Sequence, residues 1–254
     1  MKNYLEIAIE GAVAAGHEIL KVYESDFAVE HKDDKSPLTL ADKLGHLKIL
    51  SYLDNTPFPV LSEEGKHVSY DERKYWKRFW LVDPLDGTKE FIKRNGEFTV
   101  NIALVENGIP VIGVIYLPVK DILYIGSEDG AFKYEAYAAG GSRKEALPLP
   151  KGNRSYSIVG SRSHMSTATE AFFEEKKKEH GEVEVLTVGS SLKFCIVAEG
   201  KADAYPRYAP TMEWDTGAGH AIILAAGFNV TKFNTTEPLV YNKEDLLNPW
   251  FLVS

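Results

Sequence analysis

The segment from Val82 to Phe91 reads Val-Asp-Pro-Leu-Asp-Gly-Thr-Lys-Glu-Phe and concentrates side chains that can do chemistry. Pro84 fixes its own φ and favours a tight turn. That turn allows Asp83, the carbonyl of Leu85 and Asp86 to face one centre. Carboxylate and carbonyl oxygens are ligands that suit Mg²⁺. The spacing therefore predicts a magnesium site.

The same segment can also hold phosphate. Gly87 and Thr88 follow the two acids at the point where helical residues begin. A helix N-terminus favours anions because its first backbone N–H groups have no partner within the helix. The alternative is an ordinary type I turn, in which Asp is favoured at the first position. Taken alone, the segment leaves both interpretations open.

Further acids stand at the ends of two other predicted elements. The pair Glu63-Glu64 follows the apolar residues 59–61, and Asp215 follows Trp214 at the start of a glycine-rich helix. Taken singly, the pair is a solvated turn and Asp215 is a helix N-cap. Together with the acids of the first segment, they would leave several carboxylates at sheet edges without cations. A site for two or three metal ions accounts for all of them.

A second anion site is predicted in the C-terminal half. The run Gly189-Ser190-Ser191-Leu192-Lys193 lies at a strand-to-helix junction, with Lys193 one turn into the helix. Cys195 follows on an apolar helix face and predicts a buried, inert thiol. The charged run 174–182 predicts a solvated helix face.

Helices and an antiparallel sheet are expected to position the acids of the N-terminal half. Thr39 with Asp42 fits a capping pattern at the start of a helix, which puts Asp42 in its first turn. An Asn-Gly step predicts a hairpin between two strands. The expected helices are 5–22 and 40–53, and the expected strands are 79–82, 98–105, 111–116, 122–125 and 131–134. Breakers without periodicity over 138–153 indicate a boundary between two lobes.

Strands and helices alternate in the remainder of the chain. The expected strands are 156–160, 183–188 and 202–205, and the expected helices are 167–180, 192–199 and 215–226. Such alternation predicts a sheet sandwiched by helices. The expected fold class is therefore α/β, with an N-terminal α+β lobe of residues 1–145 and a C-terminal α/β lobe of residues 146–254.

Composition excludes several classes of protein. Of 254 residues, 44% are hydrophobic and 26% are charged, as in soluble globular proteins. The net charge of −8 and the lack of any basic run longer than three residues argue against a nucleic-acid polymer as partner. A single cysteine fits the reducing cytoplasm. We expect neither an export signal nor a transmembrane segment; peripheral membrane association and oligomeric state stay open.

Asp83-Pro-Leu-Asp-Gly-Thr88, with Glu63-Glu64 upstream and Trp214-Asp215 downstream, resembles the two signature motifs of the lithium-sensitive, magnesium-dependent inositol monophosphatase superfamily. The similarity covers almost the whole chain and is most specific over 75–103 and 189–221. Within the superfamily the chain looks most like the 3′(2′),5′-bisphosphate nucleotidases. The resemblance implies a layered sugar-phosphatase fold of alternating helix and sheet layers, with the active site between two lobes.

The resemblance also implies a set of metal ligands. One Mg²⁺ would be held by Glu63, Asp83 and the carbonyl of Leu85, and a second by Asp83, Asp86 and Asp215. A third, weaker ion would lie near Glu63. Li⁺ and Ca²⁺ are expected to inhibit, because Li⁺ carries too little charge and Ca²⁺ holds the geometry too loosely.

Water activation and substrate recognition follow from the same resemblance. Asp42 matches the acid that orients or activates the attacking water together with Thr88, and Glu63 is the alternative base. Lys193 and Arg207 would neutralise a 5′-phosphate that is not cleaved. The implied substrate-binding set is Glu63, Leu85, Asp86, Gly87, Thr88, His164, Ser190, Ser191, Lys193, Arg207 and Asp215.

The implied reaction is hydrolysis of 3′-phosphoadenosine 5′-phosphate to AMP and phosphate, with 3′-phosphoadenosine 5′-phosphosulfate as a further candidate substrate, in sulfur assimilation and nucleotide recycling. A phosphomonoester dianion resists attack by an anionic nucleophile, so cations must neutralise its oxygens. The alternatives are an inositol or sugar monophosphatase of the same superfamily and, more distantly, a non-catalytic regulator that binds phosphorylated metabolites.

Overall fold

The computed structural model describes residues 1–25, 37–141, 143–150, 152–160 and 166–254. The helices of these residues are α1 (Lys2–Tyr23), α2 (Pro37–Leu53), α3 (Tyr70–Arg73), α4 (Thr88–Lys93), α5 (Thr167–His180), α6 (Leu192–Ala198) and α7 (Glu213–Ala225). The strands are β1 (Val60–Ser62), β2 (Arg78–Asp86), β3 (Thr99–Glu106), β4 (Ile109–Leu117), β5 (Ile122–Ser127), β6 (Gly130–Glu135), β7 (Arg143–Leu147), β8 (Tyr156–Val159), β9 (Val183–Leu186), β10 (Tyr205–Arg207), β11 (Val230–Lys232) and β12 (Phe251–Val253).

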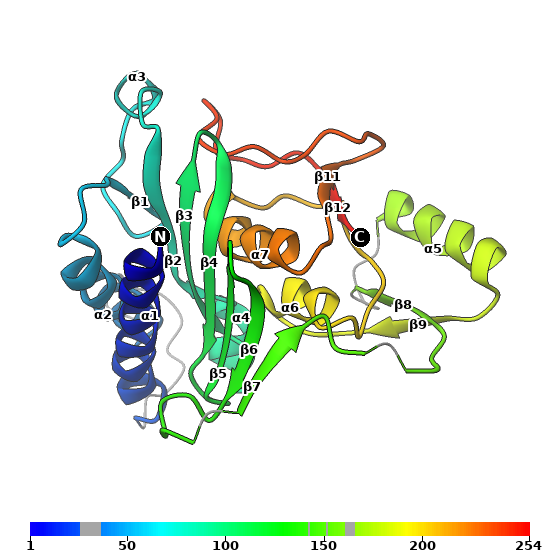
Figure 1. Ribbon diagram of the computed structural model, residues 1–254, viewed down its shortest axis with the longest axis horizontal. Coiled ribbons are helices and arrows are strands. Elements are labelled where there is room, and N and C mark those ends of the chain that lie inside the picture. The colour runs from blue at the N-terminus through cyan, green and yellow to red at the C-terminus, as the bar shows by residue number, and fades with distance from the viewer. Residues whose placement is uncertain (26–36, 142, 151, 161–165) are drawn as a thin grey trace.

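A seven-stranded sheet stands at the centre of the fold, with β1 to β7 in chain order. β1 runs parallel to β2, and each later neighbour is antiparallel. Figure 1 shows α1 and α2 on one face of this sheet and α6 and α7 on the other, with the smaller sheets and α5 beyond them. The predicted α/β fold of alternating helix and sheet layers is confirmed.

Strand periodicity explains why helices cover both faces. In β2, Phe79 and Leu81 pack in the cluster that contains α6 and α7, whereas Trp80 and Val82 pack in the cluster with α1 and α2. Each of these four side chains is at most 1% exposed. Burying a side chain of this size contributes about 1.5–3 kcal/mol. The continuous apolar run therefore marks a strand covered on both sides.

Glycine lets α7 lie directly on the sheet. A Cβ atom added at Gly113 of β4 would lie 2.2 Å from the carbonyl oxygen of Ala218, and one at Gly126 of β5 would lie 2.5 Å from the Cα of Ile222. Both contacts are with helix backbone, so no flexible side chain can move aside. The helix that carries Asp215 at its start is thereby held against the central sheet, whose strand β2 carries Asp83 and Asp86.

We expect Gly113→Ala to lower the free energy of unfolding by about 1–3 kcal/mol, because the added methyl group overpacks the contact with α7. Thermal melts should show a decrease of the melting temperature by several degrees. Gly141→Ala is the matched control, since a Cβ there meets no heavy atom within 4 Å. Equal melting temperatures for Gly113→Ala and Gly141→Ala would show that a methyl group at residue 113 does not destabilise the protein.

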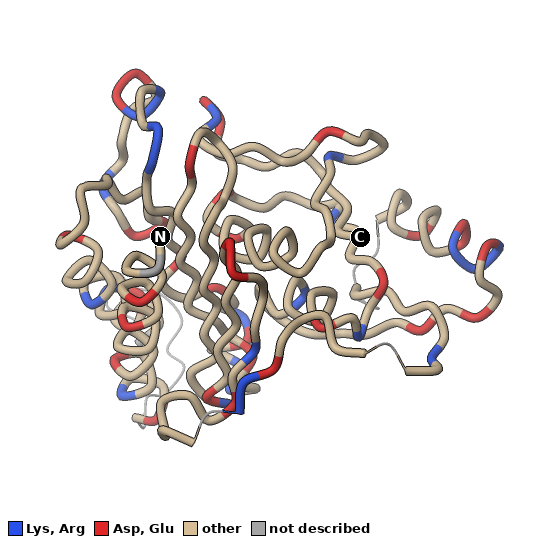
Figure 2. Tube along the Cα trace, viewed as in Figure 1, with Lys and Arg blue, Asp and Glu red and all other residues tan. Residues whose placement is uncertain are grey.

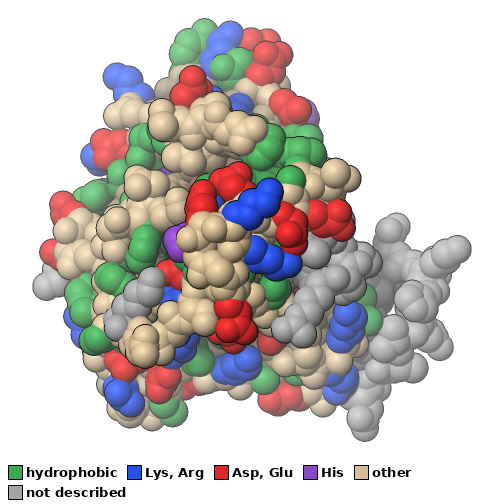
Figure 3. Space-filling model, turned by 90° about the vertical axis from the view of Figure 1, so that its right-hand side faces the viewer, with side chains coloured by type: hydrophobic (Ala, Val, Ile, Leu, Met, Phe, Trp, Pro, Cys, Tyr) green, Lys and Arg blue, Asp and Glu red, His purple; other side chains and the backbone are tan. Residues whose placement is uncertain are grey.

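Several predicted elements agree with the structure. Helix α5 has the predicted bounds, and the hairpin between β3 and β4 turns at Asn107 and Gly108, whose φ angles of 51° and 79° suit a primed turn. The charged run 174–182 lies on and just beyond the exposed face of α5, where Figure 3 shows side chains of both signs gathered. Cys195 is fully buried, as predicted.

Other boundaries were predicted wrongly. Helix α2 begins at Pro37, three residues before the predicted start, because proline suits the first position of a helix. Asp42 therefore lies in the second turn, and Thr39 is not the cap of the helix. Strand β2 continues to Asp86, whereas the prediction ended it at Val82.

The segment 138–153 was expected to lack regular structure, but it contains β7. Because β7 is an edge strand paired only with β6, most of its side chains are exposed and show no apolar alternation. The predicted boundary at residue 145 falls within this strand. The division into two lobes stays a prediction.

The C-terminal residues do not form the single helix-covered sheet that alternation suggested. β8 and β9 form a parallel pair, while β10, β12 and β11 form a separate antiparallel sheet. The strand predicted at 202–205 lies at Tyr205–Arg207, and Ala204 makes only an isolated bridge to Ile158. Strands β11 and β12, of three residues each, were too short to predict from periodicity.

Candidate metal and phosphate site

Parallel pairing of β1 and β2 brings two of the predicted acids together. Ser62 pairs with Val82 at the end of β1, and the backbone N–H of Glu63 donates to the carbonyl of Val82 at 3.2 Å. Glu63, which follows β1, therefore lies beside Asp83 of the neighbouring strand β2. Burial raises the pKa of the Glu63 carboxyl, and its interaction with the Asp83 side chain opposes that increase.

A bulge in β2 shapes the segment that contains Asp83 and Asp86. Asp83 pairs with Asn101 and Asp86 with Thr99, so β2 has one residue more than β3 over this stretch. The backbone N–H of Leu85 donates to Oδ1 of Asp83 at 3.1 Å. Such bulges bend a strand and redirect its side chains. The segment thus turns within the strand rather than after it.

Asp86 and Asp215 are connected through Ser191. The Ser191 hydroxyl donates to Oδ2 of Asp86 at 2.6 Å and lies 2.9 Å from the carbonyl oxygen of Asp215. Asn101 donates from Nδ2 to Oγ of Ser191 at 2.9 Å. Because Ser191 and Asn101 are almost fully buried, this network fixes the Asp86 carboxylate between β3, α6 and α7.

Asp215 stands at the third position of α7, not at its N-cap. Its Oδ2 accepts the backbone N–H of Met212, the N-cap residue, at 2.9 Å. The N-cap interpretation of Asp215 is therefore wrong in position, although the side chain does stabilise the start of the helix.

The acids raise one another's pKa. Burial raises the pKa of Asp83 well above its usual range, and the charges of Asp86, Glu63, Asp215 and Asp42 add to the increase. The Asp83 carboxyl is only 1% exposed. These acids therefore share one electrostatic environment that favours protons or cations.

Two neighbouring acids respond in the same way. Burial, with the charges of Glu64 and Glu63, raises the pKa of Asp42 to about 8. Burial and the charge of Asp86 raise the pKa of Asp215 to about 7, against the hydrogen bond from Met212. At neutral pH the metal-free site therefore retains protons that a bound cation would displace.

The donor set fits a hard divalent cation in its chemistry. Carboxylates predominate, and their raised pKa values reflect negative charge without enough compensation. Within the described ranges, however, no three Asp, Glu, His or Cys side chains are arranged closely enough to hold an ion as they stand. Hydrogen bonds from Ser191 and Met212 occupy oxygens of Asp86 and Asp215. The predicted metal ligands stay a prediction.

We expect Mg²⁺ to stabilise the protein more at pH 8 than at pH 6. The folded-state pKa values of Asp42 and Asp215, about 8 and about 7, exceed the ~3.9 of an unfolded chain. The metal-free protein binds more protons folded than unfolded over this range, so its stability decreases as the pH rises through both values. Mg²⁺ replaces the lost protons.

Thermal melts at pH 6 and pH 8 with and without millimolar Mg²⁺ measure this effect. Calorimetric titration near pH 7 in two buffers of different ionisation enthalpy should show that Mg²⁺ binding releases protons. A Mg²⁺ effect that is equal at both pH values, with no proton release, would contradict the expectation.

Two cations lie beside the acids. Lys193 donates from Nζ to the carbonyl of Ser190 at 3.1 Å, and burial and the charge of Arg207 lower its pKa while the charge of Asp86 raises it. Arg207 in turn acts on the pKa of Asp215. Its Nε is buried without a hydrogen-bond partner among the described residues. An anion bound here would meet both cations next to the carboxylates.

The turn that follows Asp86 packs against the loop that precedes α6, the helix that carries Lys193. Gly87 adopts a φ of 95° as the N-cap of α4, and a Cβ at this position would lie 3.1 Å from the Cβ of Ser190. Thr88 begins α4 and is exposed. The structure thus brings the two predicted anion-binding segments together.

Comparison with known proteins identifies the family. The model of the inositol monophosphatase family matches residues 1–250. The chain belongs to the inositol monophosphatase family. Its members are metal-dependent phosphatases, which agrees with the concentration of acids at one edge of the central sheet.

Individual members of the family are closely similar over almost their whole length. The 3′(2′),5′-bisphosphate nucleotidase CysQ of Salmonella typhimurium is 46% identical over 254 residues, covering 98% of this chain and 99% of that protein. CysQ of Escherichia coli strain K12 is 47% identical over 245 residues, covering 94% and 95%. The crystal structure of CysQ from Bacteroides thetaiotaomicron has 52% identity and a TM-score of 0.92, covering 99% of this chain and 96% of that one.

Sequence reasoning missed residues that hold the candidate site in place. Asn101 holds Ser191, and its signal was an amide within the otherwise apolar run 100–105. Glu97 accepts the N–H of Gly189 with its carboxylate, and its backbone carbonyl accepts the hydroxyl of Ser190 at 2.5 Å. No spacing rule links Glu97 to a loop some ninety residues later.

The remaining predictions concern residues other than the acids. His164 falls outside the described residues. In the part of the chain that the structure describes, Lys and Arg positions are scattered over the fold rather than gathered on one element (Figure 2). No helix within the described ranges has the length and apolarity to cross a membrane.

Proposed function

We propose that this chain is a Mg²⁺-dependent 3′(2′),5′-bisphosphate nucleotidase that hydrolyses 3′-phosphoadenosine 5′-phosphate to AMP and phosphate. Its similarity to CysQ nucleotidases over nearly the whole chain supports this activity. The observation that carries the substrate class is the placement of Lys193 and Arg207 beside the acids. A bisphosphate substrate presents a second phosphate for such a pair, which a monophosphate lacks.

Glu63, Asp83, Asp86, Asp215 and the carbonyl of Leu85 would hold two Mg²⁺ ions, with a weaker third ion near Glu63. When bound, the ions neutralise phosphate oxygens and lower the pKa of an attacking water. The network of Ser191 and Asn101 supports this assignment, because it holds the Asp86 carboxylate in one orientation.

Asp42 and Thr88 orient the water that attacks phosphorus. The Asp42 carboxylate accepts a hydrogen bond or proton from this water, and the Thr88 hydroxyl holds it in line with the ester bond. Glu63 is the alternative base. The raised pKa of Asp42 supports its role as a group able to take up a proton near neutral pH.

Lys193 and Arg207 hold the phosphate that is not cleaved. Gly87 and Thr88 present backbone N–H groups to the reacting phosphate at the start of α4. Ser190 and His164 contact the ribose or adenine. Ser191 also belongs to the predicted contacts, although its buried hydroxyl is directed at Asp86 in the structure.

Phosphate release from a panel of phosphomonoesters tests the proposal. We expect Mg²⁺-dependent release from 3′-phosphoadenosine 5′-phosphate, inhibition by Li⁺ and Ca²⁺, and much slower release from inositol 1-phosphate. The same panel compares 3′-phosphoadenosine 5′-phosphosulfate. Equal rates on inositol 1-phosphate and the bisphosphate nucleotide would favour a monophosphatase, and no release from any ester would favour a non-catalytic binding protein.

A further inference from the structure

Helix α2 presents Asp42 and His46 on one face. Residues four apart in a helix lie one above the other, so both side chains lie on the same side of α2. The adjoining face is packed into the core, where Ala41 and Ile49 are fully buried. A Cβ at Gly45 would lie 3.0 Å from Cδ1 of Ile19 and 3.6 Å from the Cβ of Pro84. The helix is therefore held against the segment that contains Asp83 and Asp86.

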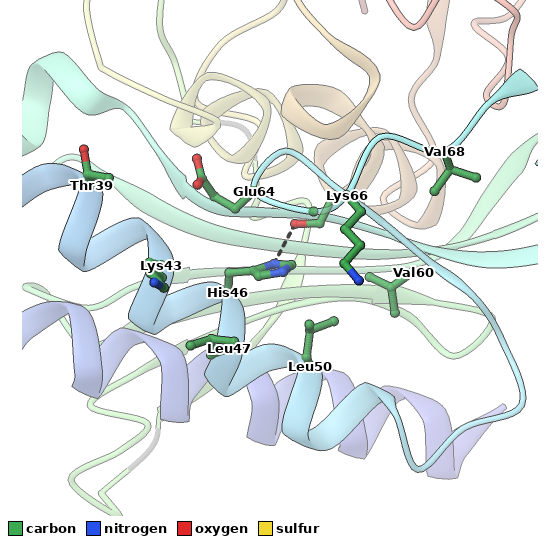
Figure 4. A pocket seen from close by; sticks show the side chains of 11 residues that line it. Thr39, Lys43, His46, Leu47, Leu50, Val60, Glu64, Lys66 and Val68 are labelled. Carbon is green, nitrogen blue, oxygen red and sulfur yellow. Dashed lines mark hydrogen bonds between the residues drawn. The ribbon is translucent and has the colours of Figure 1, made fainter. Parts of the chain in front are cut away.

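His46 connects this helix to the strand that leads into Glu63. Its Nδ1 lies 3.0 Å from the hydroxyl of Ser62, the last residue of β1, as the dashed line in Figure 4 shows. Ser62 is only 7% exposed, and its carbonyl accepts the N–H of Gly65. The peptide that follows Ser62 is held by the hydrogen bond from Glu63 to Val82. Both the backbone and the side chain at the end of β1 are thus fixed.

A pocket of about 560 Å³ opens between α2 and the segment of residues 60–68. Leu47 and Leu50 line it from the helix, and Val60 and Val68 line it from the other side (Figure 4). Where this pocket opens, side-chain packing does not close the space between the two elements. The hydrogen bond of His46 is a direct polar connection across that opening.

The hydrogen bond bears on catalysis because each of its elements carries an acid of the proposed mechanism. Asp42 lies one turn before His46 on α2, and Glu63 follows Ser62 directly. The charges of Glu64 and Glu63 raise the pKa of Asp42, so these acids lie close enough to interact electrostatically. Burial lowers the pKa of His46, which keeps its ring neutral at pH 7 and able to share one proton with the hydroxyl.

We propose that His46 is a positioning residue, whose hydrogen bond to Ser62 sets the separation between Asp42 on α2 and Glu63 beyond β1. This role rests on the proposed phosphatase function. Displacements of about 1 Å at a reacting centre can cost two orders of magnitude in rate. Loss of the hydrogen bond therefore lowers turnover while leaving the cationic pair that binds the second phosphate in place.

Steady-state kinetics on four variants test this role, with melting temperatures measured on the same samples. His46→Ala and Ser62→Ala each lower kcat about tenfold, with KM changed less than twofold. His46→Asn restores kcat to within about threefold of the wild type, because its amide occupies the place of Nδ1. The double variant His46→Ala/Ser62→Ala is no slower than either single variant, because both remove the same interaction.

Leu50→Ala is the matched control. Leu50 lies one turn beyond His46 and lines the same pocket, so the variant loses packing but no hydrogen bond to Ser62. We expect a lower melting temperature with kcat nearly unchanged. Multiplicative losses in the double variant, failure of His46→Asn to restore turnover, or an equal loss of kcat in Leu50→Ala would overturn the positioning role.

The proposed substrate class can fail independently of this inference. If the wild type prefers another phosphomonoester, the nucleotidase proposal is wrong, and the same variants are compared on the preferred ester. The kinetic pattern among the variants then still decides whether His46 positions the acids. A wild type that hydrolyses no ester overturns both.

Discussion

Asp83→Asn will lower kcat on 3′-phosphoadenosine 5′-phosphate by about 10³-fold, the upper end of what loss of one electrostatic stabiliser costs. Asp83 is the acid that the proposed arrangement shares between both ions. It is also the most deeply buried of the acids at the site. Its carboxyl is fixed in the bulge of β2 by the N–H of Leu85.

The same substitution will not destabilise the metal-free protein at pH 8. Burial and the charges of Asp86 and Glu63 raise the pKa of Asp83, so ionising this carboxyl is unfavourable in the folded state. Asparagine has the same shape and no charge, so it removes the repulsion. We expect an equal or higher melting temperature without Mg²⁺, and loss of most of the increase that Mg²⁺ gives the wild type.

Glu128→Gln is the control for the change of charge, because Glu128 is an exposed acid in the turn between β5 and β6. It should retain wild-type kcat and the full response to Mg²⁺. An Asp83→Asn protein with undiminished turnover would show that the active site lies elsewhere or that other residues hold the metal ions. A variant that is inactive and also unfolds at a much lower temperature would indicate a structural role for the carboxylate.

Local sequence patterns predicted those parts of the fold in which one element determines its own structure. The Asn107-Gly108 step defines its hairpin because both residues accept positive φ. The uniformly apolar run at 79–82 predicted a strand covered on both faces. In each case the physical cause lies within a few residues of sequence.

Elements that depend on distant partners could not be predicted in this way. β7 is strand because β6 offers it an edge, although its own side chains are mostly exposed. β12 lies between β10 and β11, and only the tertiary fold brings these short segments together. The bulge in β2 likewise depends on its register with β3.

The candidate site, like the fold, was predicted from the sequence only in part. The acids could be selected from the sequence because several carboxylates are costly to place near one another without a cation, whereas Arg207 was selected only through the family resemblance. The residues that hold them, Asn101, Glu97 and His46, make their contacts across long sequence separations. Their side chains are ordinary in isolation, so their roles appear only once the fold is known.

Removal of the cationic pair will change substrate preference rather than the chemical step. Arg207→Ala and Lys193→Met should each raise KM for 3′-phosphoadenosine 5′-phosphate about 10- to 100-fold, because a hydrogen bond to a charged group contributes about 1.5–3 kcal/mol. On 3′-AMP, which lacks the second phosphate, KM should change less than threefold. The ratio of the two KM values therefore reports the contact with the phosphate that is not cleaved.

Both substrates must be measured because Lys193 and Arg207 also interact electrostatically with the acids. The charge of Arg207 opposes the increase that burial and Asp86 cause in the pKa of Asp215, and the charge of Asp86 acts on the pKa of Lys193. If Lys193 and Arg207 served only to balance the negative charge of the acids, their removal would slow the hydrolysis of both substrates equally. Lys178→Met, on the exposed face of α5, controls for the loss of one positive charge and should change neither KM. Equal losses on 3′-AMP and the bisphosphate would assign Lys193 and Arg207 to the metal site and leave the second phosphate without a partner.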